Sequence, residues 1–132
     1  MFARISLKKS IPLDIRNHQV GDWGYDEGSI WSAASYEMSE DSRFAITIHE
    51  LVEAYLCRKA GIRDEEVCQW DEKYENDRTE DESEPGDHKH APYREQHQAA
   101  THVERAVCHA LGLNWKEHSQ SVTGSAEDHP KT

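Results

Sequence analysis

The chain has 132 residues, of which 36% are hydrophobic and 31% are charged, and its formal net charge is −11; this length and apolar content fit one domain with one small core. The negative charge argues against nucleic acid and anionic membranes as partners, because binding to phosphate needs clustered Lys and Arg. No apolar run approaches the ~20 residues that a membrane-spanning helix needs, and a metal cation or a basic surface is the more compatible partner.

The first third of the chain holds two strand patterns on either side of a turn-rich segment. Apolar and polar residues alternate over residues 1–11, which predicts a short strand. Residues 17–29 contain three glycines among Asn, Asp and Ser, and we interpret them as turns. Residues 30–38 alternate again and predict a second strand. The residues expected on one face of this second strand are Ile30, Ser32, Ala34 and Tyr36.

Residues 43–60 form the strongest helix pattern in the chain. SEDS at 39–42 supplies N-cap residues and acidic groups that favour the positive end of a helix dipole, and Gly61 ends the helix. A shorter helix is predicted over residues 64–74, with Asp64 as its N-cap. The apolar residues that recur at three- and four-residue steps in the long helix, and that we expect to be buried, are Phe44, Ile48, Leu51, Val52, Tyr55 and Leu56.

An acidic loop and a second long helix follow. Residues 75–91 are rich in Asp and Glu and contain a Pro-Gly pair, so we interpret them as a solvated loop; a calcium site or a lid is the alternative, although the spacing fits no EF-hand. The second long helix is predicted over residues 92–111, with Gly112 as its cap. The apolar stripe expected on that helix is Ala99, Ala100, Val103, Ala106, Val107, Ala110 and Leu111.

Residues 119–132 are predicted to be a disordered tail, so the single domain covers residues 1–118.

We assign no catalytic or metal-binding role to the cysteines or to three of the histidines. The cysteine count is odd and no two cysteines form a Cys-x-x-Cys pair, which indicates reduced thiols in the cytoplasm. We expect the cysteines to be small core residues, namely Cys57, Cys68 and Cys108. We expect three histidines to be surface residues, namely His18, His118 and His129.

The most apolar helix carries three ionisable residues, His49, Glu50 and Glu53, at its centre. Positions i and i+4 lie on one helix face, so His49 and Glu53 point the same way and a single divalent ion could bridge them. Glu50 lies about 100° around the helix from His49, where it can approach a metal-bound water without being a ligand. The arrangement follows the zinc-peptidase pattern His-Glu-x-x-His, with Glu53 in place of the second histidine.

A further ligand is expected from the second long helix. His97 ranks first, because a group near the start of one helix can reach the middle of a packed neighbour. Glu104, two turns later, is either a fourth ligand or a partner that holds a histidine ring. His102 ranks third, as an oxyanion donor or a surface residue. An exposed polar face is the alternative for His49 and Glu53, but a carboxylate without a partner is costly inside an apolar segment. Zinc is the expected metal, and manganese or iron would fit the same ligands.

Several stretches of the sequence carry a resemblance to known proteins. They are GDW at 21–23, SEDSRFAITIHELVEA at 39–54, EPGD at 84–87, APYREQH at 91–97, ATHVERAV at 100–107 and LGLNW at 111–115. In them the chain resembles a group of small, uncharacterised phage and prophage proteins, and its first long helix is similar to that of the zincin metallopeptidases. The resemblance implies as site residues His49, Glu50, Glu53, His97 and Glu104; His102 is not part of the pattern. In zincins the strand ahead of the helix is a sheet edge that pairs with an extended peptide, so the resemblance implies that residues 30–38 line the cleft.

We therefore expect an α+β, zincin-like domain, with a short N-terminal sheet packed on two long helices and a third, shorter helix. The leading hypothesis is a zinc-dependent hydrolase, a small metallopeptidase acting on a peptide or protein, in which Glu50 is the general base that takes a proton from the zinc-activated water and passes it to the leaving amine. One alternative is a non-catalytic, phage-type binding or inhibitor protein that is stabilised by the metal and acts on a host factor. Another has no metal, with His49 and Glu53 hydrogen-bonded beside Glu104. The expected compartment is the cytoplasm, that of the host cell if the protein is phage-encoded.

Overall fold

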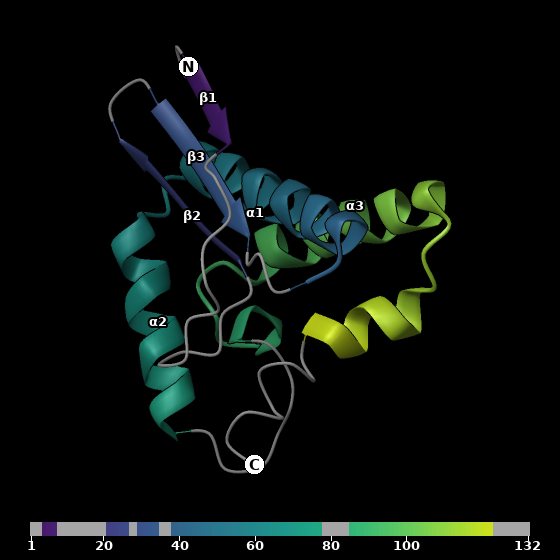
Figure 1. Ribbon diagram of the computed structural model, residues 1–132. Helices are drawn as coiled ribbons and strands as arrows, with labels where there is room; N and C mark the ends of the chain where they lie inside the picture. The colour runs from purple at the N-terminus through teal and green to yellow at the C-terminus, as the bar shows by residue number, and fades with distance from the viewer. Residues whose placement is uncertain (1–3, 8–20, 27–28, 35–37, 78–84, 123–132) are drawn as a thin grey trace.

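The computed structural model describes residues 4–7, 21–26, 29–34, 38–77 and 85–122, and it has the α+β class that the sequence predicts (Figure 1). The described strands form a three-stranded sheet in the order β1-β3-β2. The helix α1 packs against β2 and β3 and also against α3, so it lies between the sheet and the second long helix. This central position of α1 brings its buried face within reach of residues from several other elements.

The sheet consists of β1 (Arg4–Leu7), β2 (Gly21–Asp26) and β3 (Ser29–Ala34). β1 runs parallel to β3, and β2 runs antiparallel to it. The prediction of turns over residues 17–29 is therefore wrong for residues 21–26, because the whole of β2 falls inside that range; residues 17–20 and 27–28 lie outside the described residues. Gly24 lies within β2, and this position accommodates a glycine because the Trp31 ring occupies the space that a side chain would need. A Cβ there would lie 2.7 Å from the ring.

β3 is the central strand of the described sheet, and this position contradicts an expectation from the zincin resemblance. That resemblance implied that residues 30–38 form a sheet edge, but β3 is paired with β1 on one side and with β2 on the other. The shared face predicted for Ile30, Ser32 and Ala34 is confirmed, and the structure shows that it is buried; Tyr36 lies outside the described residues. The Ser32 hydroxyl donates to the backbone carbonyl of Thr47 at 2.8 Å, which ties the sheet to α1.

The first long helix, α1 (Glu40–Ala60), begins three residues earlier than predicted. Its N-cap is Ser39, whose hydroxyl accepts a hydrogen bond from the backbone N–H of Ser42 at 3.2 Å. Gly61 ends the helix with a φ of 78°, a left-handed conformation that favours glycine. Both ends of the helix are thus capped by the residue types that the sequence places there.

The buried face predicted for α1 is wrong for Phe44 and Tyr55, whereas the other four residues of the prediction are half-buried. Phe44 is 51% exposed and Tyr55 is 44% exposed, while His49 and Glu53 are buried. Polar side chains can occupy an interior position when they satisfy one another's hydrogen-bonding groups, and these two do so. The residues that α1 buries are Ser42, Ala45, Ile46, His49, Glu53, Ala54 and Cys57.

The second long helix, α3 (Arg94–Leu111), also turns a different face inward than its apolar stripe predicts. Pro92 precedes the helix, and Gly112 caps its C-terminal end with a φ of 75°. Four residues of the predicted stripe are exposed, namely Ala99, Ala106, Ala110 and Leu111. The residues that α3 buries are His97, Ala100, Glu104 and Cys108.

The shorter helix is confirmed as α2 (Asp64–Asp77), which continues past the predicted end at residue 74. The described end of the acidic loop is a short 3-10 helix, η1 (Pro85–Asp87), and residues 78–84 lie outside the described structure. The Trp70 indole N–H donates to the carbonyl of Pro85 at 2.9 Å and attaches η1 to α2. The main apolar cluster that joins these elements contains Trp23, Ile30, Ala54, Cys57, Val67, Ala91 and Tyr93.

A helix over residues 115–122 follows α3, so the prediction that disorder begins at residue 119 is wrong for residues 119–122. Val122 packs against Ala34 of β3 and Ile46 of α1, and this apolar contact attaches the helix to both elements. The remainder of the predicted tail, residues 123–132, lies outside the described structure.

The three cysteines, all in described segments, are free thiols. Cys57 and Cys108 are buried as predicted, whereas Cys68 is exposed, so its assignment to the core is wrong. Among the helices that the structure describes, none has the length and hydrophobicity required to cross a membrane.

Candidate metal centre

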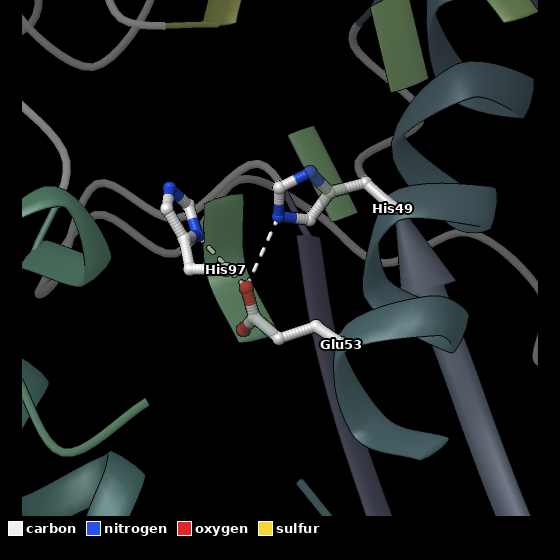
Figure 2. A group of neighbouring side chains, drawn as sticks. All are labelled: His49, Glu53 and His97. Atoms are coloured by element: carbon white, nitrogen blue, oxygen red, sulfur yellow. Dashed lines mark hydrogen bonds and ion pairs between the residues drawn. The ribbon is translucent and has the colours of Figure 1, made fainter. Parts of the chain in front are cut away.

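Three side chains from the two long helices meet in the interior (Figure 2). His49 and Glu53 lie one turn apart on α1, and His97 lies in the first turn of α3. Glu53 Oε2 is 3.2 Å from His49 Nε2 and 2.8 Å from His97 Nδ1. One potential ligand atom from each residue lies within 4.8 Å of the others, and all three residues are only 4–5% exposed. The structure thus brings together the three highest-ranked ligands of the sequence analysis.

The donor set is of a kind that zinc uses. Zinc bonds of about 2.0 Å place the ligand atoms of a tetrahedron about 3.3 Å apart. The two distances from Glu53 to the histidine rings, 3.2 Å and 2.8 Å, are close to that value. Two histidines and one glutamate form one of the ligand sets that catalytic zinc sites use, and such a set leaves the fourth position for water or substrate.

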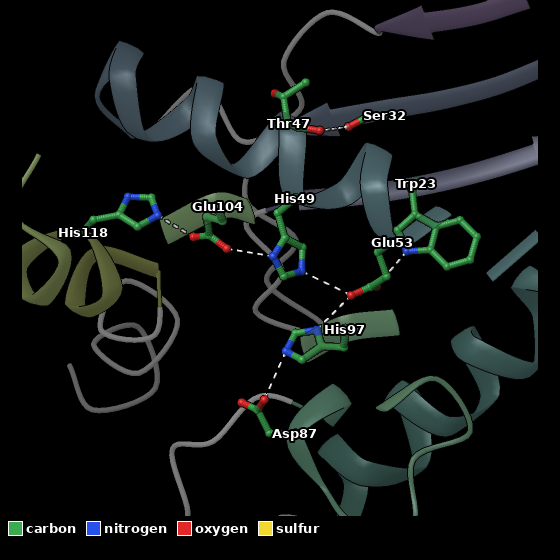
Figure 3. Close-up of polar contacts among 9 residues, drawn as sticks. All are labelled: Trp23, Ser32, Thr47, His49, Glu53, Asp87, His97, Glu104 and His118. Carbon is green, nitrogen blue, oxygen red and sulfur yellow. Dashed lines mark hydrogen bonds and ion pairs between the residues drawn. The ribbon is translucent and has the colours of Figure 1, made fainter. Parts of the chain in front are cut away.

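A carboxylate oxygen also lies within ion-pair distance of the other nitrogen of each histidine ring (Figure 3). His49 Nδ1 is 2.7 Å from Glu104 Oε1, and His97 Nε2 is 3.3 Å from Asp87 Oδ1. Histidines that bind metals usually have such a partner, which fixes the ring and its tautomer. Of the two roles expected for Glu104, its position behind the His49 ring fits that of a ring-holding partner.

Asp87 was not singled out in the sequence, where it is one of many acids in the predicted loop. The backbone of η1 brings it to His97, and Gly86 makes the close approach feasible. A Cβ at Gly86 would collide with the His97 ring, so the turn can lie against the imidazole only because residue 86 is a glycine. Gly86 and Asp87 of the Pro-Gly-Asp sequence therefore both lie against the His97 ring.

Trp23 was also not predicted to be a site residue. Its indole N–H donates to Glu53 Oε1 at 2.9 Å, while the other carboxylate oxygen faces the two histidines. This hydrogen bond orients Glu53 so that one oxygen is directed toward the position where a cation would lie. Its only signal in the sequence is the GDW stretch at 21–23.

His118, which we expected on the surface, is buried in the helix over residues 115–122. His118 Nε2 lies 2.5 Å from Glu104 Oε2, and its Nδ1 lies 2.9 Å from the hydroxyl of Ser42. The prediction is wrong because the surrounding sequence is polar and gives no sign of a helix that folds back onto α1.

The charges of the cluster stabilise one another in the absence of a metal. Burial alone raises the pKa of Glu53, but hydrogen bonds from His49 and His97 outweigh it and lower the pKa to about 2. Burial alone lowers the pKa of His49, but contacts with Glu104 and Glu53 outweigh it and hold the pKa well above its ordinary value. Without a cation, therefore, His49 keeps a proton that a metal ion would displace.

Glu50 is on α1 beside this cluster, and its side chain lies against Gly21 of β2. Burial raises the pKa of Glu50 well above its ordinary value, and the negative charge of Glu53 adds to the effect. Glu50 therefore binds a proton more readily than an exposed glutamate does.

His102 is exposed on α3 and takes no part in the cluster. His18 and His129 lie outside the described residues. Comparisons with protein-family models, with curated proteins and with solved structures found no match to this chain.

Proposed function

We propose that the protein is a zinc-dependent hydrolase, in which His49, Glu53 and His97 hold the ion. The observation that carries the proposal is the convergence of these three side chains on a common point. The carboxylates behind both histidine rings support it, because this arrangement is typical of histidines that bind metals. We further propose that the domain is zincin-like, since the histidine and the two glutamates occupy one helix in the His-Glu-x-x-Glu order.

In the proposed reaction Glu50 is the general base. When bound, zinc polarises a carbonyl group and lowers the pKa of a coordinated water toward neutrality. Glu50 takes the proton from the attacking water and transfers it to the leaving amine of a peptide. Because β3 is the central strand, an extended peptide that paired with the sheet beside the site would pair with β2.

Metal content and peptide hydrolysis test this proposal together. We expect purified protein to contain zinc close to one ion per chain and to cleave an unfolded protein such as casein. Glu50→Gln should keep the zinc and lose the cleavage, because the amide cannot accept the proton from water. Equal cleavage by this variant and the parent would show that Glu50 is not the base, and a metal-free parent would exclude the hydrolase.

The second candidate function is a non-catalytic binding protein, for example a phage inhibitor of a host factor, in which zinc stabilises the fold. The observation that favours it is the burial of His49, Glu53 and His97, because structural zinc sites are closed to solvent. Removal of zinc by a chelator distinguishes the two functions. Loss of the helical circular dichroism signal, together with absence of cleavage by the zinc-loaded protein, would support the binding protein.

A further inference from the structure

The helix over residues 115–122 contributes one buried imidazole to the surroundings of the candidate metal centre (Figure 3). We propose that His118 is a positioning residue of this centre, which acts through Glu104 to hold the His49 ring in the orientation that binds metal. The proposal deepens the function proposed above and rests on it. It assigns to the last described helix a role in metal binding rather than in packing alone.

The contacts form a continuous chain from α1 through the last helix to α3 and back to α1. Ser42 Oγ is 2.9 Å from His118 Nδ1, and His118 Nε2 is 2.5 Å from Glu104 Oε2. Glu104 Oε1 is 2.7 Å from His49 Nδ1. Each oxygen of Glu104 thus faces a different imidazole, so the carboxylate cannot rotate without breaking one of the two contacts.

This arrangement selects one tautomer for each ring. If the Ser42 hydroxyl donates to His118 Nδ1, then His118 Nε2–H donates to Glu104. The other Glu104 oxygen lies 2.7 Å from His49 Nδ1, and this contact favours a proton on that nitrogen; when a metal is bound, the lone pair of His49 Nε2 would then face Glu53 and the cation position. Without His118, Glu104 would keep one buried oxygen without a donor and would be free to turn away from His49.

Ser42, His118 and Glu104 have the composition of a hydrolase triad, but their burial excludes that role. The side chain of His118 is 0% exposed, and its two ring nitrogens face Ser42 and Glu104, so the imidazole is held inside the protein between these two groups. Ser42 lies in the first turn of α1, where its backbone N–H is bound by the N-cap. Among the described residues, the contact of the imidazole with Glu104 is the one that leads toward His49.

Zinc affinity and the absorption spectrum of the cobalt-substituted protein test the proposal on the full chain. His118→Leu removes the donor with little change in side-chain volume, whereas His118→Gln keeps an N–H group that can reach Glu104. Ser42→Ala removes only the hydroxyl that orients His118. His109→Leu is the matched control, because His109 is an exposed histidine on α3. Zinc affinity is measured by competition with a chromophoric chelator at one pH.

We expect His118→Leu to weaken zinc binding by about 10–100-fold, the usual effect of losing an outer partner of a metal-binding histidine. Its cobalt bands should also shift, since the His49 ring takes a new orientation. His118→Gln should recover most of the affinity, Ser42→Ala should lose less than His118→Leu, and His109→Leu should match the parent. If His118→Leu does not fold, a measurable loss of affinity in Ser42→Ala supports the proposal and unchanged affinity overturns it.

A folded His118→Leu that binds zinc as tightly as the parent, with the same cobalt spectrum, overturns this proposal and leaves the metal centre intact. Equal loss of affinity in His118→Leu and His118→Gln also overturns it, because only packing would then matter. A parent protein that binds neither zinc nor cobalt overturns both this proposal and the hydrolase. The failures of the two proposals are therefore distinguishable.

Discussion

Trp23 and Glu53 are joined across 30 residues of sequence by a buried hydrogen bond of 2.9 Å, in which the indole N–H donates to Glu53 Oε1. The bond links the outer strand β2 to the middle of α1 and leaves Glu53 Oε2 for the two histidines. A tryptophan that belongs to the apolar cluster thereby also determines the direction of a candidate metal ligand.

Trp23→Phe should destabilise the metal-free protein and weaken zinc binding. The phenyl ring retains most of the apolar contact, but Glu53 Oε1 loses its donor while it stays buried, which costs about 1–3 kcal/mol. Urea unfolding in the presence of a chelator measures the change in the free energy of unfolding. An unchanged unfolding midpoint would mean that water replaces the indole N–H at no cost.

Glu53→Gln should abolish stoichiometric zinc binding. The neutral amide is a poor zinc ligand, so affinity should fall by more than the ~10–100-fold that loss of an outer partner costs. Glu95→Gln provides the control, because Glu95 is exposed in the first turn of α3. Metal analysis after dialysis is the measurement, and equal zinc in the two variants would remove Glu53 from the ligand set.

The three converging residues could be predicted because helical geometry relates them directly. His49 and Glu53 differ by one turn, and His97 needs only the packing of one helix against another. The outer partners Asp87, Trp23 and His118 could not be predicted in the same way. They reach the site through contacts between elements that are distant in sequence, and no periodic pattern encodes such contacts.

The rotation of the two long helices was mispredicted for a related reason. The apolar pattern on α1 favoured burial of Phe44 and Tyr55, but the structure buries His49 and Glu53. A prediction from hydrophobic periodicity treats the burial of each polar residue as unfavourable. It does not account for two polar residues that are buried together and form a hydrogen bond with each other. The α+β class, the glycine caps of the two long helices and the strand at 30–34 were predicted correctly, because local sequence signals determine these features. Asp64, predicted as an N-cap, is instead the first residue of α2.

The metal-free protein should be most stable between about pH 4.5 and 6.5, the ordinary pKa values of glutamate and histidine. Glu53 has a lowered folded-state pKa, so its contribution is present above pH 4.5 and is lost as the pH falls toward about 2. His49 has a raised folded-state pKa, so its contribution is present below pH 6.5 and is lost as the pH rises through the raised value. Glu50 also has a raised folded-state pKa, so its contribution is present below pH 4.5 and is lost as the pH rises, which places the maximum of stability at the acidic end of this range.

Thermal unfolding in the presence of a chelator, followed by circular dichroism from pH 3 to 9, checks this prediction. The midpoint should decline on both sides of the window. The decline above pH 6.5 should disappear with zinc, because the metal binds the neutral imidazole. A midpoint that rises between pH 6.5 and 9 without metal would contradict the assigned charges.

Gly86→Ala should impair the metal centre, whereas Gly61→Ala should affect only stability. The added methyl group at Gly86 collides with the His97 ring and displaces it from Glu53. Gly61 has open space around it but a φ of 78°, so alanine there costs about 1–2 kcal/mol of conformational strain. Zinc affinity and thermal midpoint should therefore separate the two variants, and equal zinc affinities would show that η1 can retreat from His97.

Cys68 should react with iodoacetamide in the native protein, while Cys57 and Cys108 should not. Cys68 is exposed, whereas the other two thiols are buried, and burial raises the pKa of Cys57 to about 12 and that of Cys108 to about 11. Mass spectrometry of the alkylated protein should show a single modification that increases to three in urea. Native modification at Cys57 would indicate local opening of α1.

The candidate site draws on both ends of the described chain, from Trp23 in the second strand to His118 in the last helix. During synthesis the last of these side chains leaves the ribosome only after the sheet and the three preceding helices. A nascent chain therefore cannot complete the surroundings of the ion until the helix over residues 115–122 has emerged. Tight metal capture would follow the folding of all these elements, and products that end before His118 would compete poorly for zinc.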